Sequence, residues 1–176
     1  GDPLTMSTTK SATRSIGSIT SWLSGGTPNR ARAEYWRGNI PWISASTLKQ
    51  PEISTSNQWL TPTAVSVGSK MAPVGATLLL VRGSALHNEI RVGMVVAPVA
   101  FNQDVKALIP KRGVVPKYLT HVIRANESRL LQLVTSAGNT AGVLDTTVVQ
   151  AFEVLVPSEA EQAALVTVLE NVDKQI

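Results

Sequence analysis

The residues of this chain that are best suited to chemistry lie between positions 24 and 44. This segment, SGGTPNRARAEYWRGNIPWIS, interleaves a pair of adjacent glycines with three arginines and three large aromatic rings. Cations bind phosphate groups, and rings and guanidinium planes stack on nucleobases. The mixture therefore predicts a surface that approaches a polyanion closely. A second interpretation needs only a turn followed by a buried aromatic strand, because most aromatic side chains lie in protein cores.

Two further polar segments carry side chains of the same kind. Residues 82–91, RGSALHNEIR, and residues 136–142, SAGNTAG, contain arginine, serine, histidine, asparagine and threonine. Arginine pairs with guanine, asparagine with adenine, and serine or threonine with either. Each of these residues alone is more simply explained as solvated surface, whereas the set as a whole favours a bound polyanion. Asn102, just before a predicted strand, is also explained by a hydrogen bond within a turn.

The sequence shows few marks of catalysis. It has no cysteine, only two histidines that lie far apart, and no GxSxG, HExxH or phosphate-loop pattern. Its acidic residues are scattered singly, so a catalytic pair of carboxylates would have to come from distant positions. We therefore expect a protein that is not an enzyme and that holds no metal or cofactor. A hydrolase that uses His87 and Glu89 remains an alternative.

The net charge of +4 is unevenly distributed along the chain. Residues 1–150 carry 15 Lys and Arg and 7 Asp and Glu, a net charge of +8, whereas residues 151–176 carry one Lys and 5 acids, a net charge of −4. The basic body suits nucleic acid or another polyanion, and the acidic tail suits a protein partner. No apolar run is long enough to span a membrane, and no signal peptide is expected.

Turn residues and hydrophobic periodicity predict a domain that mixes helices and strands. The expected strands are residues 40–43, 77–81, 92–96, 100–109 and 152–156. The expected helices begin at proline or at a capping side chain and cover residues 31–36, 44–49, 61–69, 116–134 and 145–150. Residues 16–23 form a short apolar segment, and residues 82–91 and 136–142 are expected to be loops.

The final segment predicts a helix with a coiled-coil seam. Ser158 and Glu161 form a capping box, in which each side chain satisfies a free backbone donor at the helix start. Apolar residues then follow at spacings of four, three and four, as in a heptad repeat. They are Leu165, Leu169, Val172 and Ile176. The periodicity alone fits equally a helix that packs on a partner helix and an amphipathic helix that packs on its own domain.

Several motifs in a fixed order resemble the target recognition domain of type I restriction–modification specificity subunits. SGGTP followed by EYWRGNIPWIS resembles that family's turn and EYW-G-x-IPW segment, and LLLVRGSALHNEIRVGMVV its strand–RG loop–strand unit. AFNQDVKALIPK is similar to its NQD-x-K-x-L-x-P strand, and VPKYLTHVIRA to the helix that follows. VLVPSEAEQAALVTVL resembles the segment that begins its spacer helix. The resemblance covers residues 16–176.

The resemblance implies a non-catalytic DNA-specificity subunit of a restriction–modification system that defends against phage. Two target recognition domains each recognise one half of a split double-stranded DNA site, and two long antiparallel helices hold them apart. Such a subunit docks a methyltransferase (modification) subunit, and the assembly recruits a nuclease and translocase (restriction) subunit. S-adenosylmethionine, ATP and Mg belong to those partners rather than to this chain. The implied location is the cytoplasm of a bacterium or archaeon.

On this basis we expect an α/β (α+β) fold with a mixed, strongly twisted β-sheet, short helices and a C-terminal helix that begins a coiled-coil spacer. Residues 1–5 are expected to be a remnant ahead of Met6, residues 6–157 the recognition domain, and residues 158–176 the start of the spacer helix. The alternative is a protein–protein module, such as an assembly or decoy factor, that uses the basic face on an acidic protein.

The resemblance indicates which side of the domain faces DNA more firmly than it indicates single residues. The expected base or groove contacts are Arg30, Arg32, Arg82, Ser84, His87, Asn88, Arg91, Asn139 and Thr140. The expected phosphate contacts are Arg37, Lys49 and Lys106. The expected scaffolding residues are Gly25, Gly26, Trp42 and Leu78–Leu80.

Overall fold

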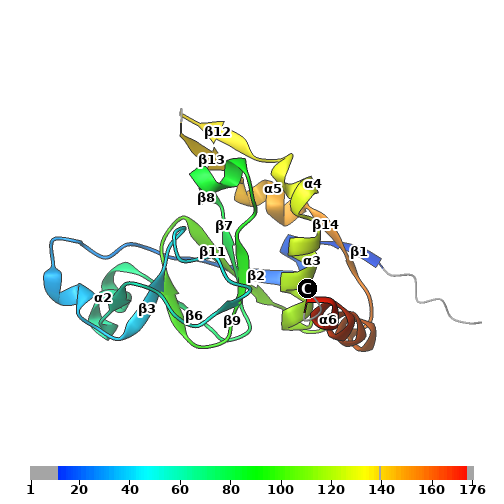
Figure 1. Cartoon of the computed structure of the whole chain (residues 1–176), viewed down its shortest axis with the longest axis horizontal. Helices are drawn as coiled ribbons and strands as arrows, with labels where there is room; N and C mark the ends of the chain where they lie inside the picture. Colours follow the sequence, from blue (N-terminus) through cyan, green and yellow to red (C-terminus); the bar gives the residue numbers. More distant parts are fainter. Residues whose placement is uncertain (1–11, 139, 174–176) are drawn as a thin grey trace, which may run out of the picture.

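The computed structural model describes residues 12–138 and 140–173 and shows a mixed α/β fold (Figure 1). The described strands form four sheets, which contain both parallel and antiparallel pairs. Most helices are short, and the longest is the C-terminal one. The expected fold class is confirmed. Within the described ranges, no helix has both the length and the apolar composition needed to cross a membrane.

The largest sheet has five strands and contains much of the core. Its order is β2 (Thr20–Ser24), β11 (Val105–Pro110), β7 (Thr77–Leu80), β9 (Val92–Val95) and β4 (Glu52–Ile53). Every residue of β7 and β9 is buried. The continuous apolar run in β7 predicts a fully buried strand, and that prediction is confirmed.

A second sheet builds a smaller lobe, at the left of Figure 1. Its order is β5 (Trp59–Leu60), β3 (Ile40–Ile43), β10 (Val99–Phe101) and β6 (Met71–Ala72). The 3-10 turn η1 (Ala33–Trp36) and the helix α2 (Pro62–Gly68) complete the lobe. The predicted cap of α2 is confirmed, because Thr61 Oγ1 accepts a hydrogen bond of 3.2 Å from the Ala64 N–H.

The remaining strands form two small sheets. One has the order β12 (Thr135–Ala137), β13 (Ala141–Val143) and β8 (Arg82–Gly83), and the other pairs β1 (Ala12–Ser15) with β14 (Glu153–Val156). The other helical elements are α1 (Ile16–Ile19), η2 (Ser84–His87), α3 (Pro116–Ala125), α4 (Glu127–Leu131), α5 (Thr146–Ala151) and α6 (Glu159–Asp173). The predicted cap Asp145 accepts 2.8 Å from the Thr147 N–H.

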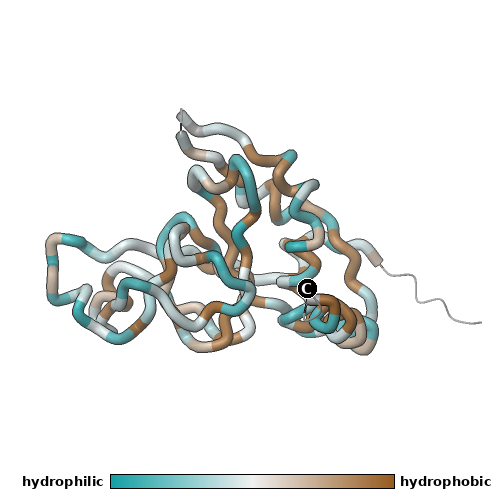
Figure 2. The backbone as a smooth tube through the Cα atoms, viewed as in Figure 1, coloured by the Kyte–Doolittle hydropathy of each residue, from teal (hydrophilic) through white to brown (hydrophobic). Residues whose placement is uncertain are grey.

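The buried apolar side chains gather in two clusters. The larger cluster includes the side chains of β7, β9 and β11 together with the inner face of α3. The smaller one lies in the small lobe and consists of Trp42, Leu60, Ala64, Val65 and Ala100. The outer end of that lobe is hydrophilic (Figure 2). The small lobe therefore has its own core and turns a polar end to solvent.

The chain passes between the small lobe and the five-stranded sheet several times, and two of these crossings lie against each other. The chain leaves β2 through Gly25–Gly26, and it returns from β10 to β11 through Asn102–Asp104. The crossings are tied together, since the Gly26 N–H donates 3.0 Å to the carbonyl oxygen of Phe101. Asn102 is buried, and its Oδ1 accepts 3.1 Å from the Asp104 N–H. The expected turn hydrogen bond of Asn102 is confirmed.

Two of the expected elements are wrong near this junction. Residues 44–49 form a turn instead of a helix, with the N–H groups of Thr47 and Leu48 both donating to the carbonyl oxygen of Ser44. The strand expected over residues 100–109 is divided into β10 and β11, because the turn at Asn102 carries the chain from one sheet to the other.

Three further expectations are wrong away from this junction. The helix that begins at Pro116 ends at Ala125, where Asn126 Nδ2 donates 2.8 Å to the carbonyl oxygen of Val122, and the chain resumes as α4. Residues 136–142 lie in the β12–β13 hairpin instead of a loop. The segment 82–91 likewise contains β8 and η2.

A buried amide fixes the start of α6 to the rest of the domain. Gln162 is 0 % exposed, and its Nε2 donates 3.0 Å to the carbonyl oxygen of Gly113 and 2.8 Å to that of Pro157. Its Oε1 accepts 2.8 Å from the Val115 N–H. The helix begins as expected, with Ser158 Oγ accepting 3.3 Å from the Glu161 N–H.

The close approach at Gly25 leads to a prediction about the stability of the fold. A Cβ at this position would lie 2.2 Å from the carbonyl oxygen of Phe101 and 2.5 Å from that of Asn102, and both atoms belong to backbone. We expect Gly25→Ala to lower the free energy of unfolding by about 3 kcal/mol or more. Urea unfolding followed by circular dichroism measures this loss.

Gly75→Ala is the matched control for Gly25→Ala. Gly75 has a φ of +93°, and its nearest contact for a Cβ is Pro116 at 3.7 Å. This control therefore adds left-handed strain without overlap, at a cost of about 1 kcal/mol. Equal losses in the two variants would contradict the close approach at Gly25.

The buried amide of α6 gives a second prediction about stability. Gln162→Ala leaves two carbonyl groups and one N–H without their hydrogen-bond partner. We expect a loss of about 2–4 kcal/mol in the free energy of unfolding, since each buried unsatisfied group costs about 1–3 kcal/mol and water reaches some of them. The control Thr167→Ala, exposed on the same helix, should change stability by less than about 0.5 kcal/mol. Equal small effects would show that the amide does not fix α6.

Candidate nucleic-acid interface

Two of the three polar segments lie side by side at the top of Figure 1. β8 pairs antiparallel with β13, with Arg82 opposite Val143, and β13 pairs with β12. We call residues 82–88 and 135–143 the hairpin edge. The fold thus brings together two segments that are about 50 positions apart in the chain, and it does so through strand pairing.

The hairpin edge exposes polar side chains over one buried apolar side chain. The exposed polar residues include the expected contacts Arg82, Ser84, His87, Asn88 and Thr140. Leu86 of η2 is buried beneath them, and a Cβ on Gly142 would approach its Cβ to 2.9 Å. A glycine therefore lets the hairpin close on η2. The expected contact Asn139 lies outside the described residues.

The end of the 82–91 segment is held by side chains that bind backbone atoms. Glu127 Oε2 on α4 accepts 3.0 Å from the Ile90 N–H. Arg91 is half-buried, and its Nε lies 2.9 Å from Glu89 Oε1 while its Nη1 donates 2.5 Å to the carbonyl oxygen of Ala45. Arg91 therefore supports the loop from below, whereas the other expected residues of the loop face solvent.

Two of the expected phosphate contacts lie in different surroundings. Lys49 is exposed on the turn before β4, and it lines a cavity of 360 Å³ together with Arg91. Lys106 is half-buried, and its Nζ donates 3.0 Å to Ser24 Oγ and 3.3 Å to the carbonyl oxygen of Gln103. Lys106 thus links the end of β2 to the turn between β10 and β11, whereas Lys49 lies on a different part of the surface.

The first polar segment lies on the small lobe, away from the hairpin edge. η1, at the left end of the molecule in Figure 1, is separated from β12 and β13 at the top. Arg30, Arg32 and Arg37 are exposed here, and we call them the arginine cluster. The structure therefore brings two of the three expected segments together and places the third at the far end of the lobe.

The guanidinium of Arg30 lies within cation–π distance of two tryptophan rings. Its Cζ lies 4.5 Å from the ring centroid of Trp36 and 5.2 Å from that of Trp42. The two rings meet edge to face, with centroids 5.1 Å apart and planes at 90°. Arg30 Nη1 also donates 3.1 Å to Gln58 Oε1. Cation–π contacts and this hydrogen bond hold the guanidinium in one place.

Arg32 is held by neighbours on its own turn. Its Nη2 lies 3.5 Å from Tyr35 Oη, and its Nε lies 3.1 Å from Glu34 Oε1. The hydrogen bond to Tyr35, and after it the charges of Tyr35 and Glu34, raise the pKa of Arg32 above its ordinary value. Arg32 therefore stays fully charged, although Glu34 offsets part of its charge.

Three site residues were missed by the sequence reasoning. Asn57, Gln58 and Trp59 line a cavity of 470 Å³ with Arg30 and residues of η1. Tryptophan is usually well buried, but Trp59 is 44 % exposed. The available signal was its position directly after the polar run 54–58, which is unusual for a core tryptophan.

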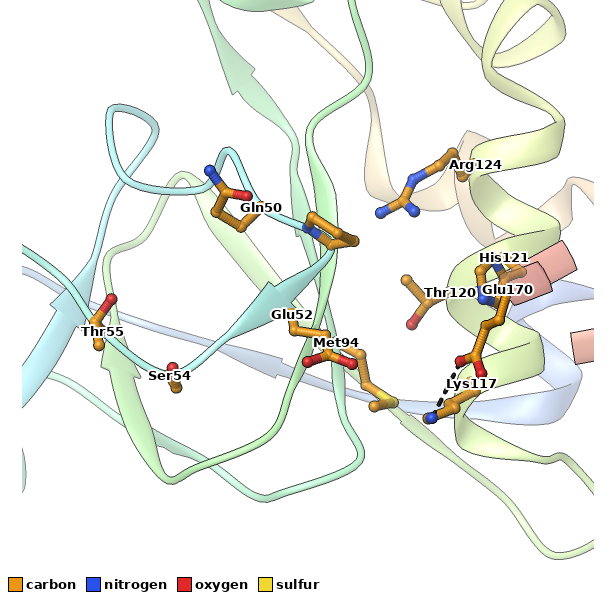
Figure 3. A pocket seen from close by; sticks show the side chains of 11 residues that line it. Gln50, Glu52, Ser54, Thr55, Met94, Lys117, Thr120, His121, Arg124 and Glu170 are labelled. Carbon is orange, nitrogen blue, oxygen red and sulfur yellow. Dashed lines mark ion pairs between the residues drawn. The ribbon is translucent and has the colours of Figure 1, made fainter. Parts of the chain in front are cut away.

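A larger cavity of 720 Å³ lies elsewhere, between the 50–55 segment and α3 (Figure 3). It is lined by Lys117 and Arg124, which serve the fold: Lys117 Nζ lies 3.1 Å from Glu170 Oε1 of α6, and Arg124 Nη2 donates 3.2 Å to the carbonyl oxygen of Val92. None of the expected contact residues lines it. In residues 12–138 and 140–173, no group of three or more His, Asp and Glu is placed to hold a metal ion.

The expected seam of α6 is exposed. Leu165, Leu169 and Val172 are 44 %, 39 % and 52 % exposed, whereas Val166 is buried. Ile176 lies outside the described residues. α6 thus packs on α3 through one face and leaves the seam residues to solvent.

Comparison with known proteins identifies relatives along most of the chain. The family model of the type I restriction modification DNA specificity domain matches residues 9–176. The specificity subunit of the type I restriction enzyme EcoR124I/EcoR124II from Escherichia coli is 31 % identical over 162 residues, which cover 91 % of this chain and 40 % of that protein. The MjaIX specificity subunit of Methanocaldococcus jannaschii is 32 % identical over 156 residues, which cover 86 % of this chain and 35 % of that protein.

A solved structure shows the same fold. The HsdS subunit from Thermoanaerobacter tengcongensis superposes with a TM-score of 0.69 at 16 % identity, over 98 % of this chain and 40 % of that one. The chain therefore spans about two fifths of the length of these proteins.

Proposed function

The chain belongs to the family of type I restriction modification DNA specificity domains, and from that premise we propose that it recognises one half of a bipartite DNA site. The family match over residues 9–176 carries the proposal. The family is defined by DNA specificity and is not catalytic, so the chemistry belongs to other chains. The net charge of +8 on residues 1–150 supports DNA as the ligand.

We propose the hairpin edge as the main surface for base contacts. Its exposed side chains match the base edges of the major groove: arginine suits guanine, asparagine suits adenine, and serine and threonine suit either. η2 holds Ser84 and His87 on a short turn, and Leu86 and Glu127 anchor that turn to the core. A preorganised turn binds with a smaller loss of conformational entropy than a loose loop.

The arginine cluster is proposed as a second contact surface, and Lys49, which lines a cavity with Arg91, as a separate phosphate contact. Arg37 and Lys49 are exposed and take part in none of the ion pairs of residues 12–138 and 140–173, which suits contacts with phosphate. Arg91 and Lys106 are assigned a supporting role, because their hydrogen bonds hold the loop base and the sheet junction. The hairpin edge and the arginine cluster lie at different ends of the domain. A ligand that contacts both must therefore be longer than either surface.

The partners proposed for the whole protein follow from α6. Its exposed row, Leu165, Leu169 and Val172, suits packing on a second helix of the same protein. A second recognition domain, a methyltransferase subunit and a nuclease subunit would complete the assembly. S-adenosylmethionine, ATP and Mg would be bound by those subunits, and the cytoplasm is the compartment that contact with host DNA requires.

The alternative of a basic protein–protein module has no support. The family and both curated relatives are specificity proteins of restriction systems. No observation favours a partner protein over DNA for the basic body.

DNA binding by this chain should depend steeply on salt. Each phosphate contact adds about 0.9 to the slope of log affinity against log salt. We expect Arg37→Ala and Lys49→Ala each to reduce that slope by about 0.9. Fluorescence anisotropy with a duplex that contains the preferred sequence, at four or more salt concentrations, measures it. A wild-type slope near zero would contradict DNA binding.

Arg82→Ala should relax the sequence preference. Loss of a bidentate contact with a base costs about 1–3 kcal/mol of discrimination at that base pair. Selection from a randomised duplex library, repeated with the variant, measures the change. Arg112→Ala, an exposed arginine outside both surfaces, is the control and should keep the full preference. If Arg82→Ala keeps it as well, the hairpin edge does not contact bases through Arg82.

A second test uses the full-length protein. Coexpression with its methyltransferase subunit, followed by mapping of methylated motifs in the host DNA, gives the half-site directly. A recurrent bipartite motif that disappears without the specificity protein is expected. Methylation that needs no specificity protein would contradict the proposal.

A further inference from the structure

The small lobe carries a recognition site of its own. We propose that Arg30, oriented by Gln58 and by two tryptophan rings, determines specificity by binding the edge of a guanine. This inference rests on the proposed function and goes beyond it, because it assigns one arginine to a base and names the residues that orient it. The ligand is one planar, polar base edge of double-stranded DNA.

The first support is the rigidity of the platform beneath Arg30. Trp42 is 1 % exposed, and its indole Nε1 donates 3.1 Å to the carbonyl oxygen of Gly26. Its backbone N–H donates 2.9 Å to the carbonyl oxygen of Gln58. Trp36 packs edge to face on Trp42 and donates 3.3 Å from Nε1 to the carbonyl oxygen of Asn29. Both rings are therefore fixed by hydrogen bonds at their polar edges.

The second support is the orientation of the guanidinium itself. A guanidinium can approach the oxygens of a phosphate from many directions, whereas O6 and N7 of guanine accept both bonds only from a fork that lies in the plane of the base. The contact with the Trp36 ring and the hydrogen bond from Nη1 to Gln58 Oε1 together restrict the orientation of Arg30. One of five N–H donors is used in this bond. The rest of the fork is left for a ligand.

The third support is the absence of a competing carboxylate. The ion pairs of residues 12–138 and 140–173 do not include Arg30, whereas they include Arg32 and Arg91. Arg30 therefore keeps its full charge for an acceptor such as O6 or N7 of guanine. Among the arginines of the two contact surfaces, it alone combines stacking on rings with the lack of an ion pair in this part of the chain.

The fourth support is the chemistry of the cavity next to Arg30. Its 470 Å³ are lined by the amides of Asn57 and Gln58 and by the indoles of Trp36 and Trp59. Amides donate to and accept from base edges, and exposed indoles pack on flat surfaces. Trp59 is 44 % exposed, although tryptophan is usually well buried. These side chains match a nucleobase better than a phosphate, which carries no flat apolar face.

Substitution by lysine separates a base contact from a phosphate contact. Lysine keeps the charge of Arg30 but loses the planar fork. The 176-residue chain and its variants Arg30→Lys and Arg30→Ala are selected on a randomised duplex library, and affinities for the winning duplex are measured across salt concentrations. We expect both variants to lose about 10- to 100-fold of discrimination at one G·C pair and to keep the preference elsewhere.

Three further variants complete the design. Gln58→Ala should weaken the preference at the same base pair, because the guanidinium of Arg30 is then free to rotate. Arg37→Ala should lower affinity for all duplexes alike, as a phosphate contact does, and Arg112→Ala should change neither measurement. Thermal unfolding of each variant checks the fold. Arg30→Lys retains a cation over the rings, so it remains informative if Arg30→Ala is unstable.

The outcomes distinguish this inference from the proposed function. If Arg30→Lys keeps the full preference and Arg30→Ala changes only the salt slope, Arg30 contacts phosphate and the inference is wrong. If Arg30→Ala changes neither preference nor affinity, the site is not used, and the hairpin edge still carries recognition. If the wild-type chain selects no sequence at all, the proposed function fails, and this inference fails with it.

Discussion

The close approach at Gly25–Gly26 is the constraint on which the rest of the domain depends. A Cβ at Gly26 would lie 2.4 Å from the carbonyl oxygen of Gly68, and one at Gly25 would overlap the backbone of Phe101. Because a Cβ here would overlap backbone atoms, only glycine lets the chain pass between β10 and the end of α2. This passage packs the small lobe against the five-stranded sheet. The proposed contact surfaces lie on either side of this passage, so the two glycines contribute to their relative position.

Local signals account for the parts of the fold that the sequence predicted. The caps at Thr61 and Asp145, the buried strand β7 and the start of α6 each depend on residues within about four positions of one another. The failures depend on distant partners. The division between β10 and β11 requires knowing that Phe101 pairs beside Ile43 while Val105 pairs with Leu80. The β12–β13 hairpin is made of small residues, which lack the alternation that marks a half-buried strand.

For the candidate site, too, some features follow from local sequence and others depend on distant partners. Residue types identified the segments, because arginine, asparagine and threonine in glycine-containing loops are a local property. Which side chains face solvent could not be predicted. Arg82 and Arg91 stand in one polar segment, yet Arg91 is tied to the carbonyl oxygen of Ala45 and Arg82 is exposed. Trp59 faces solvent because β5 pairs with β3, which buries its neighbour Leu60. Such alternation is set by register, and register depends on the whole sheet.

Gln162 shows why a polar group holds the helix that leaves the domain. An apolar side chain there would bury a similar area but would permit several rotations of α6, since apolar contacts have no direction. The amide meets two carbonyl groups and one N–H, all from the 113–115 turn and Pro157, and these three bonds fit together in one orientation. That orientation turns Val166 inward and leaves Leu165, Leu169 and Val172 outside. A single buried amide thereby helps to determine which face of the helix is left exposed.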